Sequence, residues 1–492
     1  MTTIRMNIFR ASTLFGLMLF LFSCASYNDR TALYYKQIAD GNYAQAKAEL
    51  DKNSLLKKPR NKLLLLMEEG KMAHLTGDYE GSNRYFNEAD QLLEQGLGGI
   101  MDGTVGVLVN PMSQTYKGED FEKFMIHYYK ALNYFYLNNT DEAIVEARRI
   151  TLQSQEQGDK FNNKENRYSK DAFSLMLQGL IYEGGRDVNN AFIAYRNAAD
   201  VYLTAPDTTY YGTKIPDGLK KDVIRTAYLN GFQSEQSKYE KLFNLTYKPE
   251  KAVEGGELIL FWENGLAPVK QQKEFFFSLI KDDHGNMVFT DGNIVIPFWD
   301  YDPAKVNKAS VQSLRVTYPM YVARPPYYSS ATASNGNYAV SLEKAEDINA
   351  LAFKTLDQRF AKEMGKTLAR LAVKKTAEYL LTESGKGSGK NGKNDGLLTG
   401  LGYGMQLYSL LSEKSDTRNW QSLPNQINYA RIPLQKGETK AEIKFRNGSS
   451  QKQEFYYGNS FLSQSGRFVS VGKNVASVTF YDSKGETRKL DF

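Results

Sequence analysis

The sequence predicts an α+β protein: an N-terminal array of helical repeats, followed by a β-rich part with an inserted pair of long helices. Two observations lead to this fold class. Small and aromatic residues recur at the spacing of paired helices over 31–248, and after Pro249 short apolar runs separated by turn residues replace that spacing. The helical spacing returns once, over 344–413.

The first 23 residues have the pattern of a secretory signal. Arg5 and Arg10 give a positive start, Leu14–Phe22 is an apolar run, and Leu21-Phe22-Ser23-Cys24 closes it. These last four residues are similar to the lipobox of bacterial lipoproteins. We therefore expect cleavage before Cys24, lipid on its thiol, and a lipidated tether over 24–30. An ordinary signal peptide or a short anchor is the alternative.

Composition agrees with an exported protein that has no disulfide. Cys24 is the only cysteine among 492 residues, so once it carries lipid the mature chain has neither a thiol nor a disulfide. The formal net charge is +6, and removal of Arg5 and Arg10 leaves 6 − 2 = +4, which is small for this length. Because acids and bases are interspersed, the charge gives no case for nucleic-acid binding.

Within 31–248, small residues recur where the two helices of a pair would cross, and aromatic residues recur where they would fill the groove. The clearest copy has Gly70 and Ala73, followed by Tyr79 and Phe86. This spacing is that of a tetratricopeptide repeat (TPR), whose two-helix units must stack to bury their apolar faces. The other copies lie at Tyr34–Leu50, Ala131–Ile150 and Leu175–Ala198. Because the separations vary, we expect an irregular TPR-like array.

Residues 96–118 interrupt this array with a Gly-rich apolar stretch that contains Asn110-Pro111. A stretch of this length is either a functional loop or an ordinary long connection, and both interpretations stay open.

Beyond Pro249 the apolar runs have the length of strands. Glu257–Trp262, Glu274–Ile280 and Met287–Thr290 come first, and Asp282–Asn286 predicts a hairpin turn between the last two. Strand character returns at 441–445, 453–457, 467–472 and 476–481. The simplest architecture joins 249–343 and 414–492 in one β-sandwich-like domain, and two separate β domains are the alternative.

The segment 344–413 interrupts the strands. Apolar residues at steps of three to five from Ile348 to Ala372 predict a helix of roughly 35 residues. The Gly/Lys-rich linker 384–396 would end it. Leu397–Leu411 then predicts a second helix packed on the first, with a patch facing a membrane or a partner as the alternative.

Residues that carry common enzyme chemistry form no recognisable motif. His74, His127 and His284 have no neighbouring His or Cys at ligand spacing, so we expect neither a metal nor a cofactor. The stretch 385–391 lacks the spacing of a phosphate loop and its Ser/Thr, and no Ser lies in a Gly-x-Ser-x-Gly frame. We therefore expect a protein that is not an enzyme, although distant carboxylates could still pair as in glycosidases.

Three segments carry a family pattern. Tyr116–Glu122 leads to His127–Tyr134 and Val145–Arg149; Phe261–Pro268 reads FWENGLAP; and Asp416–Pro424 reads DTRNWQSLP. These segments resemble those of a family of uncharacterised bacterial envelope lipoproteins with TPR-like N-terminal halves. In that family the second motif is similar to FENGLAP, without Trp262, and the third is similar to DTRSWLTLP, so that Asn419 and Gln421 depart from it. The resemblance spans most of the mature chain. It implies an envelope location and association with other envelope lipoproteins, but no reaction and no ligand site.

The motifs 261–268 and 416–424 also have a physical interpretation. Asn264-Gly265 suits a turn that leaves a strand. Asp416, Arg418 and Trp420 could form an ion pair stacked beside an indole, which would act as a clasp where helix meets sheet. The alternative is a recognition patch built by Trp262, Arg418 and Trp420.

These observations together favour a lipid-anchored scaffold of the cell envelope. It would bind protein or peptide partners on the concave face of the array, and Ala25 after Cys24, in place of Asp, favours the outer membrane. Whether the body faces the periplasm or the exterior stays open. The alternatives are a glycan-binding outer-membrane lipoprotein with a SusD-like role and an envelope hydrolase or transferase. The expected partner-binding residues are Tyr128, Tyr129, Arg148, Arg149, Trp262, Arg418 and Trp420.

Overall fold

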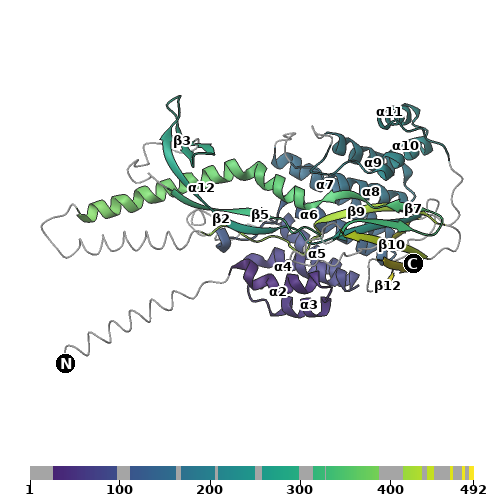
Figure 1. Ribbon diagram of the computed structural model, residues 1–492, viewed down its shortest axis with the longest axis horizontal. Coiled ribbons are helices and arrows are strands. Elements are labelled where there is room, and N and C mark those ends of the chain that lie inside the picture. The colour runs from purple at the N-terminus through teal and green to yellow at the C-terminus, as the bar shows by residue number, and fades with distance from the viewer. Residues whose placement is uncertain are drawn as a thin grey trace.

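The structure is a computed structural model of the 492-residue chain (Figure 1). It describes residues 26–96, 111–161, 168–204, 209–249, 257–298, 314–326, 328–386, 414–434, 440–447, 466–468, 479–481 and 487–491. Several expected features therefore lie outside the described residues: the signal, Cys24, most of the loop 96–118, the second inserted helix and the strand 453–457.

The described part is a mixture of helix and antiparallel sheet, which confirms the α+β class. Ten α-helices come first, and each of the first nine packs on the helix that follows it in the chain. Short 3-10 turns η1 (Pro59–Asn61) and η4 (Pro111–Ser113) precede α4 and α6. The helices are α2 (Tyr27–Ala39), α3 (Tyr43–Lys52), α4 (Lys62–Leu75), α5 (Tyr79–Glu94), α6 (Asp120–Tyr136), α7 (Thr140–Lys160), α8 (Ala172–Gly184), α9 (Val188–Leu203), α10 (Asp217–Leu229) and α11 (Gln233–Phe243).

The same three-residue turn joins the two helices of each of five pairs, from α2–α3 to α10–α11. Its middle residue has positive φ every time: Gly41, Gly77, Asn138, Arg186 and Gly231. In three of the pairs the next residue is an Asp or Asn that caps the second helix, as when Asp78 accepts from the Gly81 amide. The sequence therefore builds five helix hairpins with one local design.

Close approach within the hairpins explains the small residues of the repeat pattern. An added Cβ on Gly70 would lie 2.7 Å from the ring of Phe86, and one on Gly179 would lie 2.3 Å from the ring of Tyr195. Both contacts join the first helix of a pair to the second. The predicted role of the two glycines, close approach of paired helices, is confirmed, whereas Phe86 and Tyr195 make these contacts within their own pairs and not toward the next pair.

The strands form three antiparallel sheets among the described residues. In the first, the order is β11 (Gly466–Phe468), β1 (Glu257–Asn264), β9 (Gln426–Pro433), β8 (Glu343–Asp347). In the second it is β12 (Thr479–Tyr481), β13 (Thr487–Asp491), β10 (Lys440–Asn447), β6 (Tyr328–Ser334), β7 (Ala339–Ser341). In the third it is β4 (Val295–Pro297), β3 (Met287–Thr290), β2 (Val269–Lys281), β5 (Leu314–Val322). Because β1 pairs with β9 and β6 with β10, the strands before and after the helical insertion belong to the same sheets, which excludes two separate β domains.

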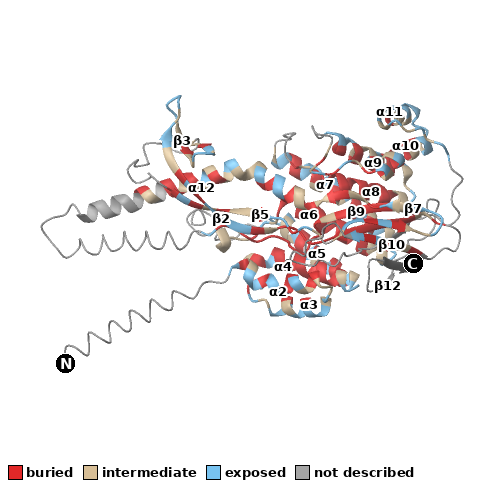
Figure 2. Cartoon of the chain, in the orientation of Figure 1, coloured by how far each residue is buried: buried red, intermediate tan, exposed pale blue. Residues whose placement is uncertain are grey.

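The first sheet is buried on both faces. Ile259 and Phe261 of β1 point into a core that continues through the helices, whereas Leu258, Leu260 and Trp262 point into a second core shared with β6 and β10. Figure 2 shows buried residues running from the helices α4 to α9 into the neighbouring strands. The helices therefore share one core with the first and third sheets, and the second sheet shares another core with the opposite face of the first.

The long helix α12 (Ile348–Lys386) packs on the third sheet, and together they project from the body on the left in Figure 1. Its predicted existence is confirmed, but the bounds differ. Residues 344–347 belong to β8, which pairs with β9, and the helix continues through 384–386, where the linker was expected to begin. No helix in the described ranges has the length and apolarity needed to cross a bilayer.

The expected tether 24–30 is also corrected. Ser26 is the N-cap of α2, and its side chain and Asp29 form a reciprocal capping box. The helix thus begins at Tyr27, and Tyr27 is 2 % exposed.

Candidate functional site

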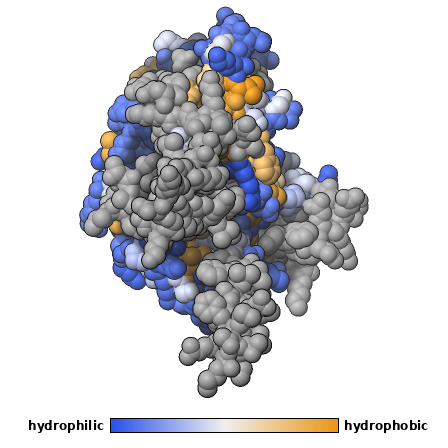
Figure 3. All heavy atoms as spheres, turned by 90° about the vertical axis from the view of Figure 1, so that its left-hand side faces the viewer, coloured by the Kyte–Doolittle hydropathy of each residue, from blue (hydrophilic) through white to orange (hydrophobic). Residues whose placement is uncertain are grey.

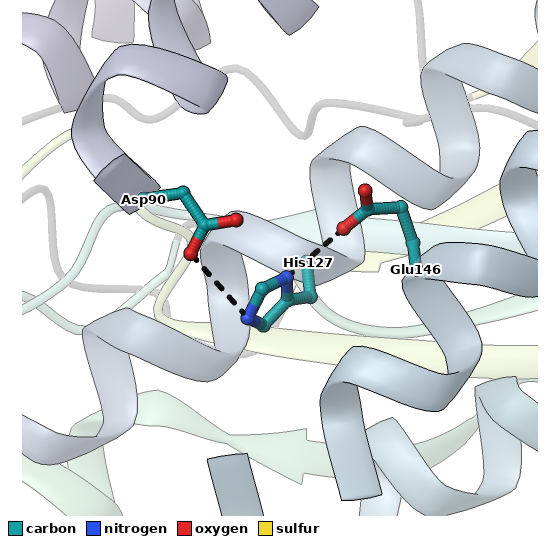
Figure 4. Close-up of side chains that lie close together, drawn as sticks. All are labelled: Asp90, His127 and Glu146. Carbon is teal, nitrogen blue, oxygen red and sulfur yellow. Dashed lines mark hydrogen bonds and ion pairs between the residues drawn. The ribbon is translucent and has the colours of Figure 1, made fainter. Parts of the chain in front are cut away.

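Three helices of the array bring five ionisable side chains together. Figure 4 shows three of them, Asp90, His127 and Glu146. His127 and Lys130 lie one turn apart on α6, and Glu146 and Arg149 lie one turn apart on α7. Asp90 comes from α5. We call these five residues the α5–α7 charge cluster.

The imidazole of His127 lies between two carboxylates. Its Nδ1 is 3.0 Å from Glu146 Oε2, and its Nε2 is 4.0 Å from Asp90 Oδ1 (Figure 4). Lys130 Nζ donates to both carboxylates, 2.9 Å from Asp90 Oδ2 and 2.9 Å from Glu146 Oε1. At the rim Arg149 Nη1 contacts Asp90 Oδ2 at 2.9 Å.

The donor set of the cluster could hold a metal ion, because ligand atoms of Asp90, His127 and Glu146 lie within 4.8 Å of one another. However, the cluster already contains its own cations. Burial raises the pKa of Asp90, but its neighbours His127, Lys130 and Arg149 together hold that pKa below its ordinary value. A divalent ion would have to displace the Lys130 ammonium from the carboxylates, so the arrangement fits an ion-pair network that joins three helices better than a metal centre.

Sequence reasoning missed this cluster because its ligands come from three helices. Of the five residues in the cluster, the sequence marked only His127 as a candidate metal ligand. Its partners in the structure are carboxylates rather than a His or Cys nearby in the sequence. The one local signal was a charged pair at i, i+3 on each of two successive helices, His127 with Lys130 and Glu146 with Arg149.

Five of the seven expected partner-binding residues are buried, which corrects that expectation. Tyr128, Tyr129, Trp262, Arg418 and Trp420 have at most 1 % of their surface exposed. The reason for Tyr128 and Tyr129 is that the chain's own β part covers their side of α6: Phe261 of β1 lies 6.4 Å from the Tyr128 ring, and Trp420 lies 5.9 Å from the Tyr129 ring. Arg148 is exposed, and Arg149 belongs to the charge cluster.

The segment 414–425 is the clasp that the sequence suggested. Arg418 Nε and Nη2 donate to the two carboxylate oxygens of Asp416 at 2.8 and 2.6 Å. Its Nη1 donates to Asn61 Oδ1 at 2.7 Å and to the Gln114 carbonyl at 3.0 Å. The cation lies over Tyr116, 5.4 Å from the ring centre, and not over Trp420. The interpretation as an inter-element clasp is confirmed, with a different aromatic partner.

The same segment reaches two buried carboxylates of the helices. Glu122 Oε1 accepts from the Trp420 amide at 2.7 Å, and Glu68 Oε2 accepts from the Ser422 hydroxyl at 2.5 Å. Glu68 also accepts from the hydroxyls of Tyr34 and Tyr35. Burial raises the pKa of Glu68 to about 7, although these three donors lower it. Burial and the charge of Glu119 raise the pKa of Glu122.

Trp262 does not join the clasp. It lies on the opposite face of β1, with its ring centre 5.2 Å from that of Phe445 in the second core. A recognition patch of Trp262, Arg418 and Trp420 is therefore not formed, and both tryptophans of the described part are interior residues.

No protein-family model matches this sequence. A search of curated proteins likewise returns no match.

Proposed function

We propose that this chain is a lipid-anchored scaffold of the cell envelope that binds a protein or peptide partner through its helical array, and that it is not an enzyme. Cys24 would carry the lipid, and the absence of Asp after it favours the outer membrane. The observation that carries the scaffold role is the series of five helix hairpins with one turn design, since stacked hairpins offer the extended surfaces that repeat proteins use for binding.

The proposal includes a TPR-like identity for the array and a β-sandwich-like identity for the first two sheets. Gly70 against Phe86 and Gly179 against Tyr195 support the former. The apolar layer between β1 and β10, with Trp262 against Phe445, supports the latter. The glycan-binding alternative needs aromatic side chains at the surface, and Trp262 and Trp420 give it no support.

The partner surface that we propose lies on the outer face of α7. Val145 is 40 % exposed and Leu152 is 56 % exposed, and Arg148 lies between them on the same face. Exposed apolar residues beside arginine are the composition of binding surfaces rather than of a solvated helix face. This surface keeps Arg148 of the expected set and replaces the buried tyrosines, whereas Arg149 pairs with Asp90 and Glu94 of α5.

Site-specific photo-crosslinking in living cells tests this surface. A photoreactive side chain at Leu152 should give a discrete covalent adduct with one envelope protein, and the additional change Arg148→Glu should weaken it at least tenfold. The matched control is the same side chain at Ser237, an exposed position on α11, which should give no such adduct. Identical patterns at the two positions would contradict the proposal.

A further inference from the structure

The first turn of α2 is fixed to the body at three places. Asn28 Nδ2 donates to the Lys270 carbonyl at 2.7 Å, at the start of β2. Gln421 Nε2 donates to Asn28 Oδ1 at 2.9 Å. Tyr27 is buried, and its hydroxyl donates to the Asn419 carbonyl at 3.5 Å. This turn cannot lengthen the tether without pulling the buried Tyr27 ring out of the core.

The chain between the proposed lipid and this fixed turn is short. Cys24 precedes Ser26 by two residues, and two residues span at most about 7 Å. The expected tether of seven residues, 24–30, would span up to about 25 Å, so the structure shortens the reach from the bilayer more than threefold.

The contacts of the first turn of α2 identify the residues that surround it on the surface. Lys270 pairs with Tyr321, and the next pair outward is Val269 with Val322, which is 43 % exposed. Tyr321 in turn contacts Phe353 of α12, which is 38 % exposed. We call the first turn of α2, the start of β2, the end of β5 and Phe353 the α2 face. Exposed Lys273 and Lys354 lie on the same two elements, β2 and α12.

We propose that the α2 face is the membrane-facing surface, held flush against the bilayer by the three residues from Cys24 to Ser26. This rests on the proposed lipid anchor. The chain enters α2 at the left edge of the helical body in Figure 1, on the side from which α12 and the third sheet project. Among the residues coloured in Figure 3, which looks at that side, hydrophilic residues predominate and apolar ones form small patches. Exposed Phe beside Lys is the composition that suits the headgroup region of an anionic leaflet.

The test uses the chain's single cysteine. Because lipid blocks Cys24, an introduced cysteine is the only free thiol. Full-length lipidated Gln271→Cys and Ser237→Cys proteins, both changed at exposed positions, are labelled with a fluorophore and placed in vesicles of phosphatidylethanolamine and phosphatidylglycerol that contain a nitroxide headgroup lipid. We expect the label at 271, on the α2 face, to be quenched at least threefold more than the label at 237 on α11.

A second variant tests whether the short tether is the cause. About 20 Gly/Ser residues inserted between Ala25 and Ser26 have an average span of about 25 Å, and they should reduce quenching at 271 to the level at 237 while the protein stays in the vesicles. Equal quenching at 271 and 237 in the original chain, or quenching at 271 that survives the insertion unchanged, would overturn the proposal. A protein that carries no lipid and does not enter the vesicles would instead contradict the proposed anchor.

Discussion

The two faces of strand β1 are covered in different ways. The face toward the helices contains Glu263, whose Oε2 lies 2.5 Å from Lys71 Nζ, and beside it lie the polar contacts of Glu68, Glu122 and Arg418. The face toward β10 is mainly apolar, with neighbours such as Leu260, Trp262 and Ile443, and its buried polar residues Asn264 and Asn428 carry no charge. The first interface is assembled from parts of the chain that lie hundreds of residues apart, as with Glu68 and Ser422.

The two faces of β1 therefore differ in how far their stability depends on particular partner residues. Apolar contacts are non-directional and tolerate repacking, whereas a buried charge requires particular partners. We infer that the helix-facing side of β1 fixes how the array sits on the sheets, and that the β10-facing side contributes burial with less dependence on pairing. Substitutions on the helix-facing side should therefore cost more than substitutions on the β10-facing side.

The largest effect should come from Arg418→Ala. It removes the guanidinium that donates to Asp416, to the buried Asn61 side chain and to the Gln114 carbonyl, so the free energy of unfolding should fall by about 5 kcal/mol. Chemical denaturation measures it. Arg446→Ala, at an exposed arginine of β10, is the control and should change the value by less than about 0.5 kcal/mol. Equal losses for the two variants would refute the clasp.

A double-mutant cycle at Lys71 and Glu263 should give the next largest effect. Both side chains are 2 % exposed, so Lys71→Met or Glu263→Met alone leaves a buried unpaired charge and should cost about 3–5 kcal/mol. The double variant should recover most of that loss. The exposed pair Glu442 and Lys444 is the control, with an expected coupling below about 1 kcal/mol. Additive losses at Lys71 and Glu263 would show that the pair is not coupled.

Protonation of the buried Glu68 should make the free energy of unfolding depend on pH. Its folded pKa of about 7 exceeds the ordinary 4.5, so the folded state binds the proton more tightly than the unfolded state. The stability that this proton contributes is complete below pH 4.5 and is lost as the pH rises through 7, by about 3 kcal/mol in total. Unfolding of the original chain and of Glu68→Gln, compared across this range, should give a difference curve of that sign. A flat difference would mean that the pKa of Glu68 is the same in the folded and unfolded states.

The smallest effect should come from the apolar side. Ile443 is fully buried between the sheets, and Ile443→Val should cost about 1 kcal/mol through one lost methylene. The loss should be the same at about pH 5 and about pH 8, which lie below and above the pKa of Glu68. A pH-dependent loss would show that the two faces are not distinct.

Contacts between residues close in the sequence could be predicted from the sequence, and contacts between distant segments could not. Gly70 and Phe86 lie within one hairpin, and Asp416 and Arg418 are two residues apart, so pattern and chemistry predicted their contacts. The partners of Arg418 at Asn61 and Gln114 come from the other end of the chain, and no periodicity indicates them.

Burial of Tyr128 and Tyr129 shows the same limit. Side chains at adjacent positions point in different directions from a helix, and both are buried only because α6 is covered on nearly every side. Sequence alone predicted a helix with an open binding face. The structure fills that face with β1 and the clasp, which is why the expected partner residues proved to be interior ones.

The anchor at Cys24 is the central claim of the proposed function, and metabolic labelling tests it most directly. Cells grown with labelled palmitate should incorporate label into the original protein and none into Cys24→Ser, and only the original should sediment with outer membranes. Equal labelling, or an unlabelled original protein that fractionates like Cys24→Ser, would contradict the account.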